Sequence, residues 1–242
     1  MNLISTQHAV FQSMPGALNC RKYNDMFVSS REHKTAIFMH EINSSEPNVE
    51  VLEKTICFEG FFRIEKYRLR HRLFSGGWSH PLVREVFERG HAAAVLPYDP
   101  VRDEVILIEQ FRVGALAAPD GSWLLEIVAG VIEAGETAQD VAKRESIEEA
   151  DCIISDLIPL YDFFVSPGGA TERVALFCGR VDSAHAGGVH GAAEEGEDIK
   201  VHVVPLDTAL TLLHSGKITS ASAIIALQWL ALNRAAVRTR WI

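Results

Sequence analysis

The sequence predicts a mixed α/β fold, in which a small antiparallel sheet precedes a larger α/β domain. From Val51 to Gly90, alternating apolar and polar residues and several aromatic residues are interrupted by Gly76 and Gly77, which is typical of short antiparallel strands. From His91 to Val204, apolar runs bounded by turn residues surround one clear helical segment. Helical periodicity then continues towards the end of the chain.

The elements of the larger domain follow from local patterns. The sequence DPVRD separates two apolar runs and predicts a hairpin. Gly130 ends a further strand, and Gly216 stops a short helix. The predicted strands are residues 91–99, 104–112, 123–130, 157–165, 173–181 and 199–204. The predicted helices are residues 137–150, 206–214 and 220–236, the first of which begins with a capping box of Thr137 and Asp140.

Residues 1–49 are predicted to be a poorly ordered extension. They lack sustained periodicity, and the segment EINSSEPN at 41–48 has the composition of a linker. Met39 stands just before this segment and is an alternative start of the chain. The predicted organisation is an extension over residues 1–49, the small sheet over residues 50–89 and the larger domain over residues 90–242.

Composition and charge exclude several classes of protein. The 242 residues are 48% hydrophobic, enough for a sizeable core, and a formal net charge of −9 argues against nonspecific binding to nucleic acid or an anionic membrane. An acidic protein can still bind phosphates through bridging metal ions. The 4 cysteines are scattered without a CxxC pair, no apolar run reaches the ~20 residues of a membrane helix, and no signal peptide is evident. We therefore expect a cytoplasmic protein with reduced thiols.

The helix at 137–150 carries acidic residues on the face that should pack inward. Glu145 and Glu149 lie one turn apart and share a face with Ala138, Val141 and Ala142. A solvated acidic face is the usual interpretation of a glutamate-rich helix, but the apolar neighbours argue against it. A divalent cation resolves the conflict, because carboxylate oxygens are ligands that Mg²⁺ and Mn²⁺ prefer.

The charged residues around this helix are regularly spaced. Their pattern resembles the Nudix box, G-x5-E-x7-R-E-U-x-E-E-x-G-U. The first glycine matches at Gly130, and every charged position matches: Glu136, Arg144, Glu145, Glu148 and Glu149. The sequence departs from the box at Ser146, where an apolar residue is usual, and at Asp151, where glycine closes the box. Because Asp tolerates left-handed backbone better than most residues, we expect the helix to end there as it does in the family.

The resemblance extends over most of the chain. From Val51 to Trp241 the sequence is similar to bacterial ADP-ribose pyrophosphatases of the Nudix hydrolase superfamily, which implies a Nudix α/β/α sandwich preceded by a small N-terminal antiparallel sheet. Pro159 and Pro167 follow the box, where a proline often marks ADP-ribose hydrolases. The supporting stretches are GFF (60–62), RHRLFSGGWSHPLVREVFERGHAA (70–93), DPVRDEVILIEQFR (99–112), LLEIVAGVIEAGE (124–136), SPGG (166–169), EDIKVHVV (197–204) and IIALQWL (224–230).

The resemblance implies a site for two or three Mg²⁺ ions, with Mn²⁺ as the alternative metal. The implied ligands are the carbonyl of Ala129 and the carboxylates of Glu145, Glu149 and Glu197. Glu195 would be the general base that activates water, although the two loop glutamates could have the opposite assignment. Without the box, the EEGED segment would be interpreted as a solvated loop. Four residues would be structural within the motif: Gly130, Glu136, Arg144 and Glu148, the last being a metal ligand in some relatives.

The resemblance also implies a set of substrate-binding residues. Arg112 would bind a diphosphate oxygen, the alternative being a surface salt bridge. Phe61 and Phe62 would stack on adenine, the alternative being core packing. The remaining residues are assigned by resemblance alone, to the base and phosphates or to the terminal ribose: Arg84, Glu85, Arg89, Val131, Ser166, Pro167, Gly168 and Glu172.

The implied function is Mg²⁺-dependent hydrolysis of ADP-ribose to AMP and ribose 5-phosphate. One alternative is a pyrophosphatase for another nucleotide sugar, such as GDP-mannose. The other is a noncatalytic Nudix protein that senses ADP-ribose, against which the intact acids and the lack of a DNA-binding pattern argue. The resemblance further implies a homodimer with composite active sites, in which Arg84 acts with Glu149 of the partner chain.

Overall fold

The computed structural model describes residues 48–192 and 196–242. The predicted extension lies outside the described residues except for its last two positions, and Glu195 also lies outside them. Within the described residues, no helix combines the length and apolar character that crossing a bilayer requires. The predicted boundaries at residues 50 and 90 stay predictions.

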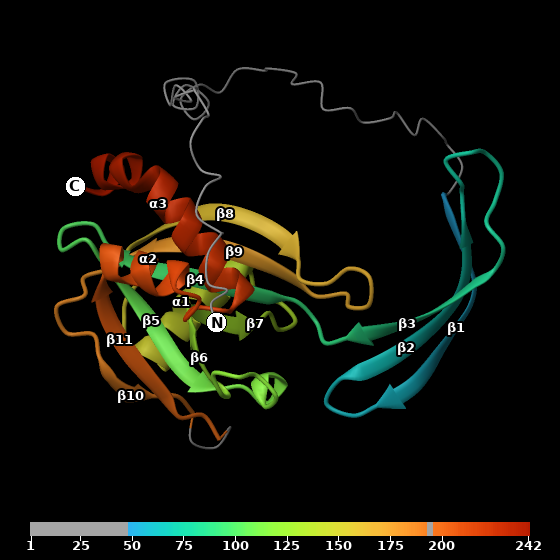
Figure 1. Cartoon of the computed structure of the whole chain (residues 1–242), viewed down its shortest axis with the longest axis horizontal. Helices are drawn as coiled ribbons and strands as arrows, with labels where there is room; N and C mark the ends of the chain where they lie inside the picture. The colour runs from blue at the N-terminus through green and yellow to red at the C-terminus, as the bar shows by residue number, and fades with distance from the viewer. Residues whose placement is uncertain (1–47, 193–195) are drawn as a thin grey trace, which may run out of the picture. The chain divides into compact units, whose positions relative to one another are not determined.

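A small antiparallel sheet contains β1 (Val49–Glu59), β2 (Arg63–His71) and β3 (Leu82–Glu88) in that order (Figure 1). This confirms the predicted N-terminal sheet. A sheet of three strands is too small to bury its own apolar side chains. Large apolar side chains of β1 therefore stay exposed, including Phe58 at 61% and Ile56 at 52%.

β3 is fixed to the loop at residues 166–171 by backbone contacts. The amide of Phe87 donates to the carbonyl of Gly169 at 2.8 Å, and the amide of Thr171 donates to the carbonyl of Phe87 at 3.2 Å. Phe87 also forms an isolated parallel bridge with Ala170. The turn SPGG therefore supports the end of the small sheet.

The large sheet has 8 strands, with the order β10-β11-β5-β4-β9-β8, while β6 pairs with β5 and β7 pairs with β4. β4 and β9 are parallel, and the other pairs in this sheet are antiparallel. The hairpin predicted around DPVRD is present as β4 and β5. The strands are β4 (Ala92–Asp99), β5 (Glu104–Phe111), β6 (Trp123–Glu126), β7 (Val128–Val131), β8 (Asp156–Phe164), β9 (Arg173–Arg180), β10 (Gly188–His190) and β11 (Ile199–Pro205).

Helices cover both faces of the large sheet, which confirms the predicted α/β/α sandwich. In Figure 1, α2 (Leu206–His214) and α3 (Ala221–Trp241) lie in front of the sheet, and α1 (Ala138–Ala150) lies behind it. One core contains Leu96 and Leu107 with Leu227 of α3, and the other contains Val95 and Ile108 with Val141 of α1. Because neighbouring residues of β4 enter opposite cores, the strand is buried throughout and its sequence does not alternate.

The structure differs from the predicted elements in three places. Residues 123–130 form two strands instead of one, separated at Ile127, because β6 pairs with β5 whereas β7 pairs with β4. β10 was not predicted, and a short 3₁₀ helix, η3 (Val113–Ala115), follows β5. α3 continues to Trp241, beyond its predicted end at residue 236.

Ion pairs fasten α3 to the turn between β4 and β5. Arg234 pairs with Asp103 in that turn and with Asp207 of α2, the latter at 2.7 Å. The hydroxyl of Tyr98, whose side chain is fully buried, donates to the same Asp103 at 2.6 Å. At the far end of α3, the indole nitrogen of Trp241 donates to Asp156 at 2.8 Å.

Candidate active site

α1 begins and ends as its sequence suggests. The hydroxyl of Thr137 accepts from the amide of Asp140, and the Asp140 carboxylate accepts from the amide of Thr137, which completes the capping box. Asp151 has left-handed backbone, with φ of 46°, and therefore ends the helix where glycine is usual. Ser146 is fully buried and donates to the carbonyl of Ala142 at 2.7 Å, so its hydroxyl is satisfied inside the core.

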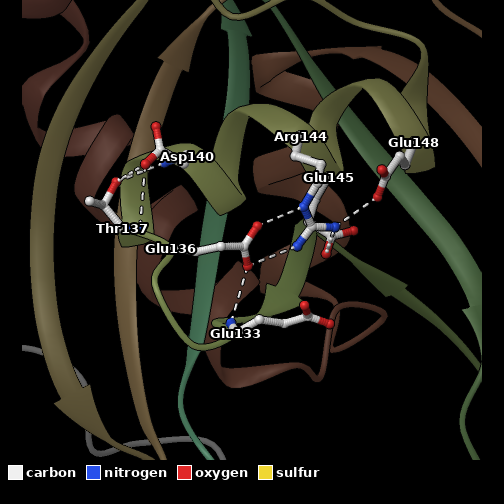
Figure 2. A network of polar contacts seen from close by, with 7 residues as sticks. All are labelled: Glu133, Glu136, Thr137, Asp140, Arg144, Glu145 and Glu148. Atoms are coloured by element: carbon white, nitrogen blue, oxygen red, sulfur yellow. Dashed lines mark hydrogen bonds and ion pairs between the residues drawn. The ribbon is translucent and has the colours of Figure 1, made fainter.

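Arg144 connects three glutamates on the exposed side of α1 (Figure 2). Its guanidinium donates to Glu136 at 3.1 Å, to Glu145 at 2.9 Å and to Glu148 at 2.8 Å. Glu136 also accepts from the amide of Glu133, and its pKa is lowered, chiefly by the hydrogen bond from Arg144. These contacts hold Glu136 and Glu145 in place through charge-assisted hydrogen bonds.

Glu149 lies on the inward side of α1 and is 3% exposed. Burial raises its pKa to about 8, with a further contribution from the charges of Glu145 and Glu197, although its hydrogen bond with Ala129 opposes the shift. The pKa of Glu145 is also raised, mainly by burial and then by the charges of Glu148 and Glu197. The structure thus brings three carboxylates together where their mutual repulsion is weakly screened.

Gly130 provides the space that Glu145 occupies. A Cβ atom at Gly130 would lie 1.8 Å from Oε1 of Glu145 and 2.2 Å from its Cδ, far inside van der Waals contact. The carboxylate of Glu145 therefore rests directly on the backbone of β7. No larger residue fits at this position without moving Glu145.

Ala129 presents its backbone to the same carboxylates. Its amide donates to Oε2 of Glu149 at 3.0 Å, although the residue lies within β7 and is paired in register with Ala94 of β4. In an antiparallel strand the amide and carbonyl of one residue point to the same side, so the Ala129 carbonyl also points away from β4. It is thus directed to the side on which Glu149 lies.

Glu197 closes the loop that precedes β11. Its amide donates to the carbonyl of Ala192 at 3.1 Å, and its carboxylate accepts from the amide of Ala192 at 3.1 Å. Gly191, which has φ of +105°, lies against Glu197, since a Cβ atom at Gly191 would come 2.8 Å from the Cβ of Glu197. Glu197 is thereby held within electrostatic reach of Glu145 and Glu149.

The donors around Glu149 fit a hard divalent cation. They are oxygen atoms, and a bound cation would favour the charged forms of Glu145 and Glu149, whose pKa values are raised chiefly by burial and further by neighbouring carboxylates. Among residues 48–192 and 196–242, no group of three or more acidic, histidine or cysteine side chains is already arranged around a metal position. This does not exclude Mg²⁺, which takes one or two carboxylates and completes its shell with water and substrate phosphate oxygens.

Arg112 lies at the edge of this acidic site. Its guanidinium donates to Glu126 of β6 at 2.7 Å, and its charge acts on Glu149, whose pKa it lowers. Glu126 is not among the residues predicted from the sequence. The sequence signal that could have found Glu126 is that it is the one carboxylate within the apolar run 123–130. Its partner Arg112 is not evident from the sequence.

A second group of predicted residues gathers where the small sheet ends. Phe61 is 94% exposed, and its ring contacts Phe62 edge to face at 4.7 Å. Arg89 lies over the ring of Phe62 at 5.4 Å and pairs with Glu172 at 3.5 Å. Phe61 and Arg89 also line a shallow pocket of about 350 Å³, together with Arg63 and Glu88.

The other predicted substrate residues are more widely spread. Arg84 and Glu85 are exposed neighbours on β3, so their side chains point to opposite faces of the small sheet. The guanidinium of Arg84 donates to the carbonyl of Val83 at 2.8 Å. Val131 ends β7 and is 42% exposed, and Ser166, Pro167 and Gly168 form the exposed turn after β8.

The NUDIX domain model matches residues 88–227, which include α1, Arg112 and Glu197. The chain belongs to the NUDIX family. It is 50% identical over 194 residues to an ADP-ribose pyrophosphatase of Escherichia coli (strain K12), which covers 80% of this chain and 93% of that protein. It is 30% identical over 181 residues to a GDP-mannose pyrophosphatase of Pectobacterium atrosepticum, which covers 74% of this chain and 92% of that protein.

A crystal structure of an ADP compounds hydrolase has the same fold, with a TM-score of 0.59 and 21% identity over 81% of this chain and 98% of that one. The NUDIX match begins at Glu88 and therefore leaves out most of the small sheet. Phe61, Phe62, Arg84 and Glu85 thus lie outside the matched NUDIX segment. The alignment with the Escherichia coli relative is longer than that segment, at 194 residues.

Proposed function

We propose that the chain is a Mg²⁺-dependent hydrolase that cuts ADP-ribose to AMP and ribose 5-phosphate. The observation that carries this proposal is the pair of Glu149, which is buried, and Glu145, which is partly buried, because both have raised pKa values that a bound cation would relieve. The substrate is supported by the relatives, since 50% identity over nearly the whole Escherichia coli protein includes the small sheet as well as the NUDIX domain.

Glu145, Glu149, Glu197 and the carbonyl of Ala129 are the groups that would hold the metal. Two or three bound Mg²⁺ ions would supply positive charge to the diphosphate and lower the pKa of a coordinated water, and Mn²⁺ could replace them. Arg144 holds the carboxylate of Glu145 over Gly130, so this proposed ligand would already be oriented to hold a metal. Arg112, whose charge acts on Glu149, would bind a diphosphate oxygen at the edge of the acidic site.

The chain's remaining contribution is to move a proton. Water oxygen forms a bond to one phosphorus, the bond from that phosphorus to the bridging oxygen breaks, and the bridging oxygen leaves on the other phosphate. The attacking water gives a proton to a carboxylate. We assign this carboxylate to Glu195, with Glu197 as a ligand. Glu195 lies next to the described loop end at Gly196, and Glu197 has hydrogen bonds that hold it in place.

Phe61 and Arg89 are the groups that would bind the nucleoside end of the substrate. An aromatic ring that is 94% exposed beside a guanidinium offers a stacking surface and a positive charge for adenine and a phosphate. Phe62 would support this surface through its contacts with Phe61 and Arg89. Other residues proposed to contact the substrate are Arg84, Glu85, Val131, Ser166, Pro167, Gly168 and Glu172.

We further propose a homodimer in which the small sheet completes the partner's active site. Its support is the exposed apolar surface of β1, where Val51, Ile56 and Phe58 are each more than half exposed in the single chain. In such a dimer, Arg84 would act with the partner's Glu149. The cytoplasm is the compartment in which such a soluble enzyme would act.

Mixing two defective variants tests the composite site. Arg84→Ala and Glu149→Gln are each expected to be weakly active. After subunit exchange, confirmed by mass, a mixed dimer would contain one site with both defects and one site with neither. Activity should therefore return on mixing. If exchange occurs and no activity returns, Arg84 and Glu149 serve the same chain.

A panel of nucleotide sugars tests the substrate. Purified protein with Mg²⁺ should hydrolyse ADP-ribose faster than GDP-mannose at equal concentration. GDP-mannose is the alternative because a relative at 30% identity is named for it, and faster turnover of GDP-mannose would overturn the substrate assignment. Binding of ADP-ribose without any turnover would instead favour a noncatalytic sensor.

A further inference from the structure

One buried side-chain donor in the large sheet has no partner. Gln110 on β5 is 6% exposed. Its Nε2 is the one buried side-chain nitrogen or oxygen without a hydrogen bond in the described ranges 48–192 and 196–242. Buried amides are nearly always paired, because an unpaired donor loses the hydrogen bonds it would make with water. A ligand acceptor at this position would gain a hydrogen bond without breaking one.

Gln110 lies on the face of the sheet that α1 covers. Alternate residues of a strand share a face, and Ile106 and Ile108 of β5 pack in the same core as α1. Gln110 continues this row, and Arg112 follows two residues later. Since the charge of Arg112 acts on Glu149, the row leads from the core into the acidic site.

The strands on either side of β5 also place Gln110 within this site. In β6, Leu124 lies opposite Gln110, and Glu126, which binds Arg112, is two residues away on the same face. In β11, the register with β5 ends at the pair of Lys200 and Glu109, so Gln110 lies beside Ile199. Ile199 is two residues after Glu197, so the segments that carry Glu126 and Glu197 flank β5 on the two sides of Gln110.

We propose that Gln110 is a further substrate-binding residue, whose Nε2 donates to a nonbridging oxygen of the diphosphate. The proposal rests on the proposed function, since a diphosphate offers only acceptors to this donor. Side chains two residues apart on a strand face start about 7 Å apart. Long side chains such as Gln110 and Arg112 can therefore converge on neighbouring phosphate oxygens.

A neutral donor suits this place better than a second cation. Glu126 already neutralises Arg112 in part, and the metal would neutralise Glu145 and Glu149. The amide nitrogen does not compete for the metal, because an NH₂ group has no free lone pair to offer it. Gln110 would thus orient the diphosphate without altering the charge of the site.

The decisive variant is Gln110→Met, which keeps the length of the side chain and removes the donor. Binding of ADP in the presence of Mg²⁺ is measured by calorimetry, and turnover of ADP-ribose is measured separately. We expect the Kd for ADP and the KM for ADP-ribose to rise about tenfold, as for loss of a hydrogen bond to a charged group. The melting temperature without ligand should be unchanged or higher, because the variant removes an unpaired buried donor.

Gln228→Met is the matched control, since Gln228 is exposed on α3, on the other face of the sheet. It should change neither affinity nor melting temperature. A purely structural role of Gln110 makes the opposite prediction for Gln110→Met, namely a lower melting temperature with unchanged affinity for ADP. That result would overturn the proposal.

The two measurements, ADP binding and ADP-ribose turnover, distinguish a failure of this proposal from a failure of the proposed function. If the wild-type protein binds ADP but does not hydrolyse ADP-ribose, the proposed activity fails, and the calorimetric comparison still decides the role of Gln110. If the wild-type protein does not bind ADP at all, the Gln110 proposal is overturned. If Gln110→Met does not fold, Gln110→Glu retains the shape and replaces the donor with an acceptor. Its affinity for ADP should then fall by more than tenfold, and unchanged affinity would overturn the proposal.

Discussion

Neutralising Glu149 should stabilise the metal-free protein while removing its activity. Glu149 is 3% exposed and has a pKa of about 8, raised by burial from the ordinary value of 4.5. A carboxyl group with a raised pKa binds more protons in the folded state than in the unfolded state between these two values. The contribution of this group to stability is therefore fully present below pH 4.5 and is lost as the pH rises towards 8.

The size of this effect follows from the shift. At about 1.4 kcal/mol per pKa unit, the difference between 4.5 and about 8 corresponds to about 5 kcal/mol at most. Glu149→Gln does not titrate, and its amide oxygen can still accept from the amide of Ala129. In EDTA, the variant should match the wild type near pH 4.5 and exceed its free energy of unfolding by several kcal/mol, up to about 5, above pH 8.

Urea denaturation in EDTA across this pH range measures the difference, provided that the m-values agree. Glu148→Gln is the control, because the side chain of Glu148 is 52% exposed and should show no comparable pH-dependent gain. Adding Mg²⁺ at high pH should stabilise the wild type more than Glu149→Gln, and turnover of the variant should be nearly abolished. A stability difference that does not depend on pH, or near-wild-type rates at saturating Mg²⁺, would refute the reasoning.

Three further predictions concern individual residues of the site. Gly130→Ala should displace Glu145, with a cost of about 1–3 kcal/mol in stability and a loss of kcat of about a hundredfold or more. Gly114→Ala is the control, because a Cβ there meets nothing within 4 Å, and comparable activities of the two variants would contradict the contact between Gly130 and Glu145. Glu126→Gln should free Arg112 and raise the KM for ADP-ribose about tenfold with a smaller change in kcat, whereas Glu109→Gln on the opposite face should not; a change in kcat alone would argue against a role in binding. Glu195→Gln should lower kcat more than it weakens binding; a raised KM at unchanged kcat would make Glu195 a binding residue, and a base-like phenotype of Glu197→Gln would reverse the two assignments.

The sequence predicted best what depends on neighbours along the chain. The capping box of Thr137 and Asp140 and the helix end at Asp151 are local, so both were predicted at the correct positions. The inward position of Glu149 followed from helical periodicity and the apolar residues around it. The spacing of the box identified the family before any tertiary contact was known.

The sequence predicted least well what depends on strand pairing. The division of residues 123–130 at Ile127 reflects pairing with two different strands, and no local pattern marks it. The contact of Glu126 with Arg112 arises only because β6 folds back on β5. Strand alternation alone, however, places Arg84 and Glu85 on opposite faces of β3, which the resemblance to the family does not indicate.

The position of α3 has a consequence for biosynthesis. The sheet face that α3 covers is made of residues such as Leu96, Leu107 and Leu176, all of which leave the ribosome long before residues 221–241. Until then, this apolar face is left without the helix that covers it, and the contacts of Arg234 and Trp241 cannot form. The nascent chain therefore passes through a stage at which binding by a chaperone competes with aggregation, and completion of the fold follows translation of α3.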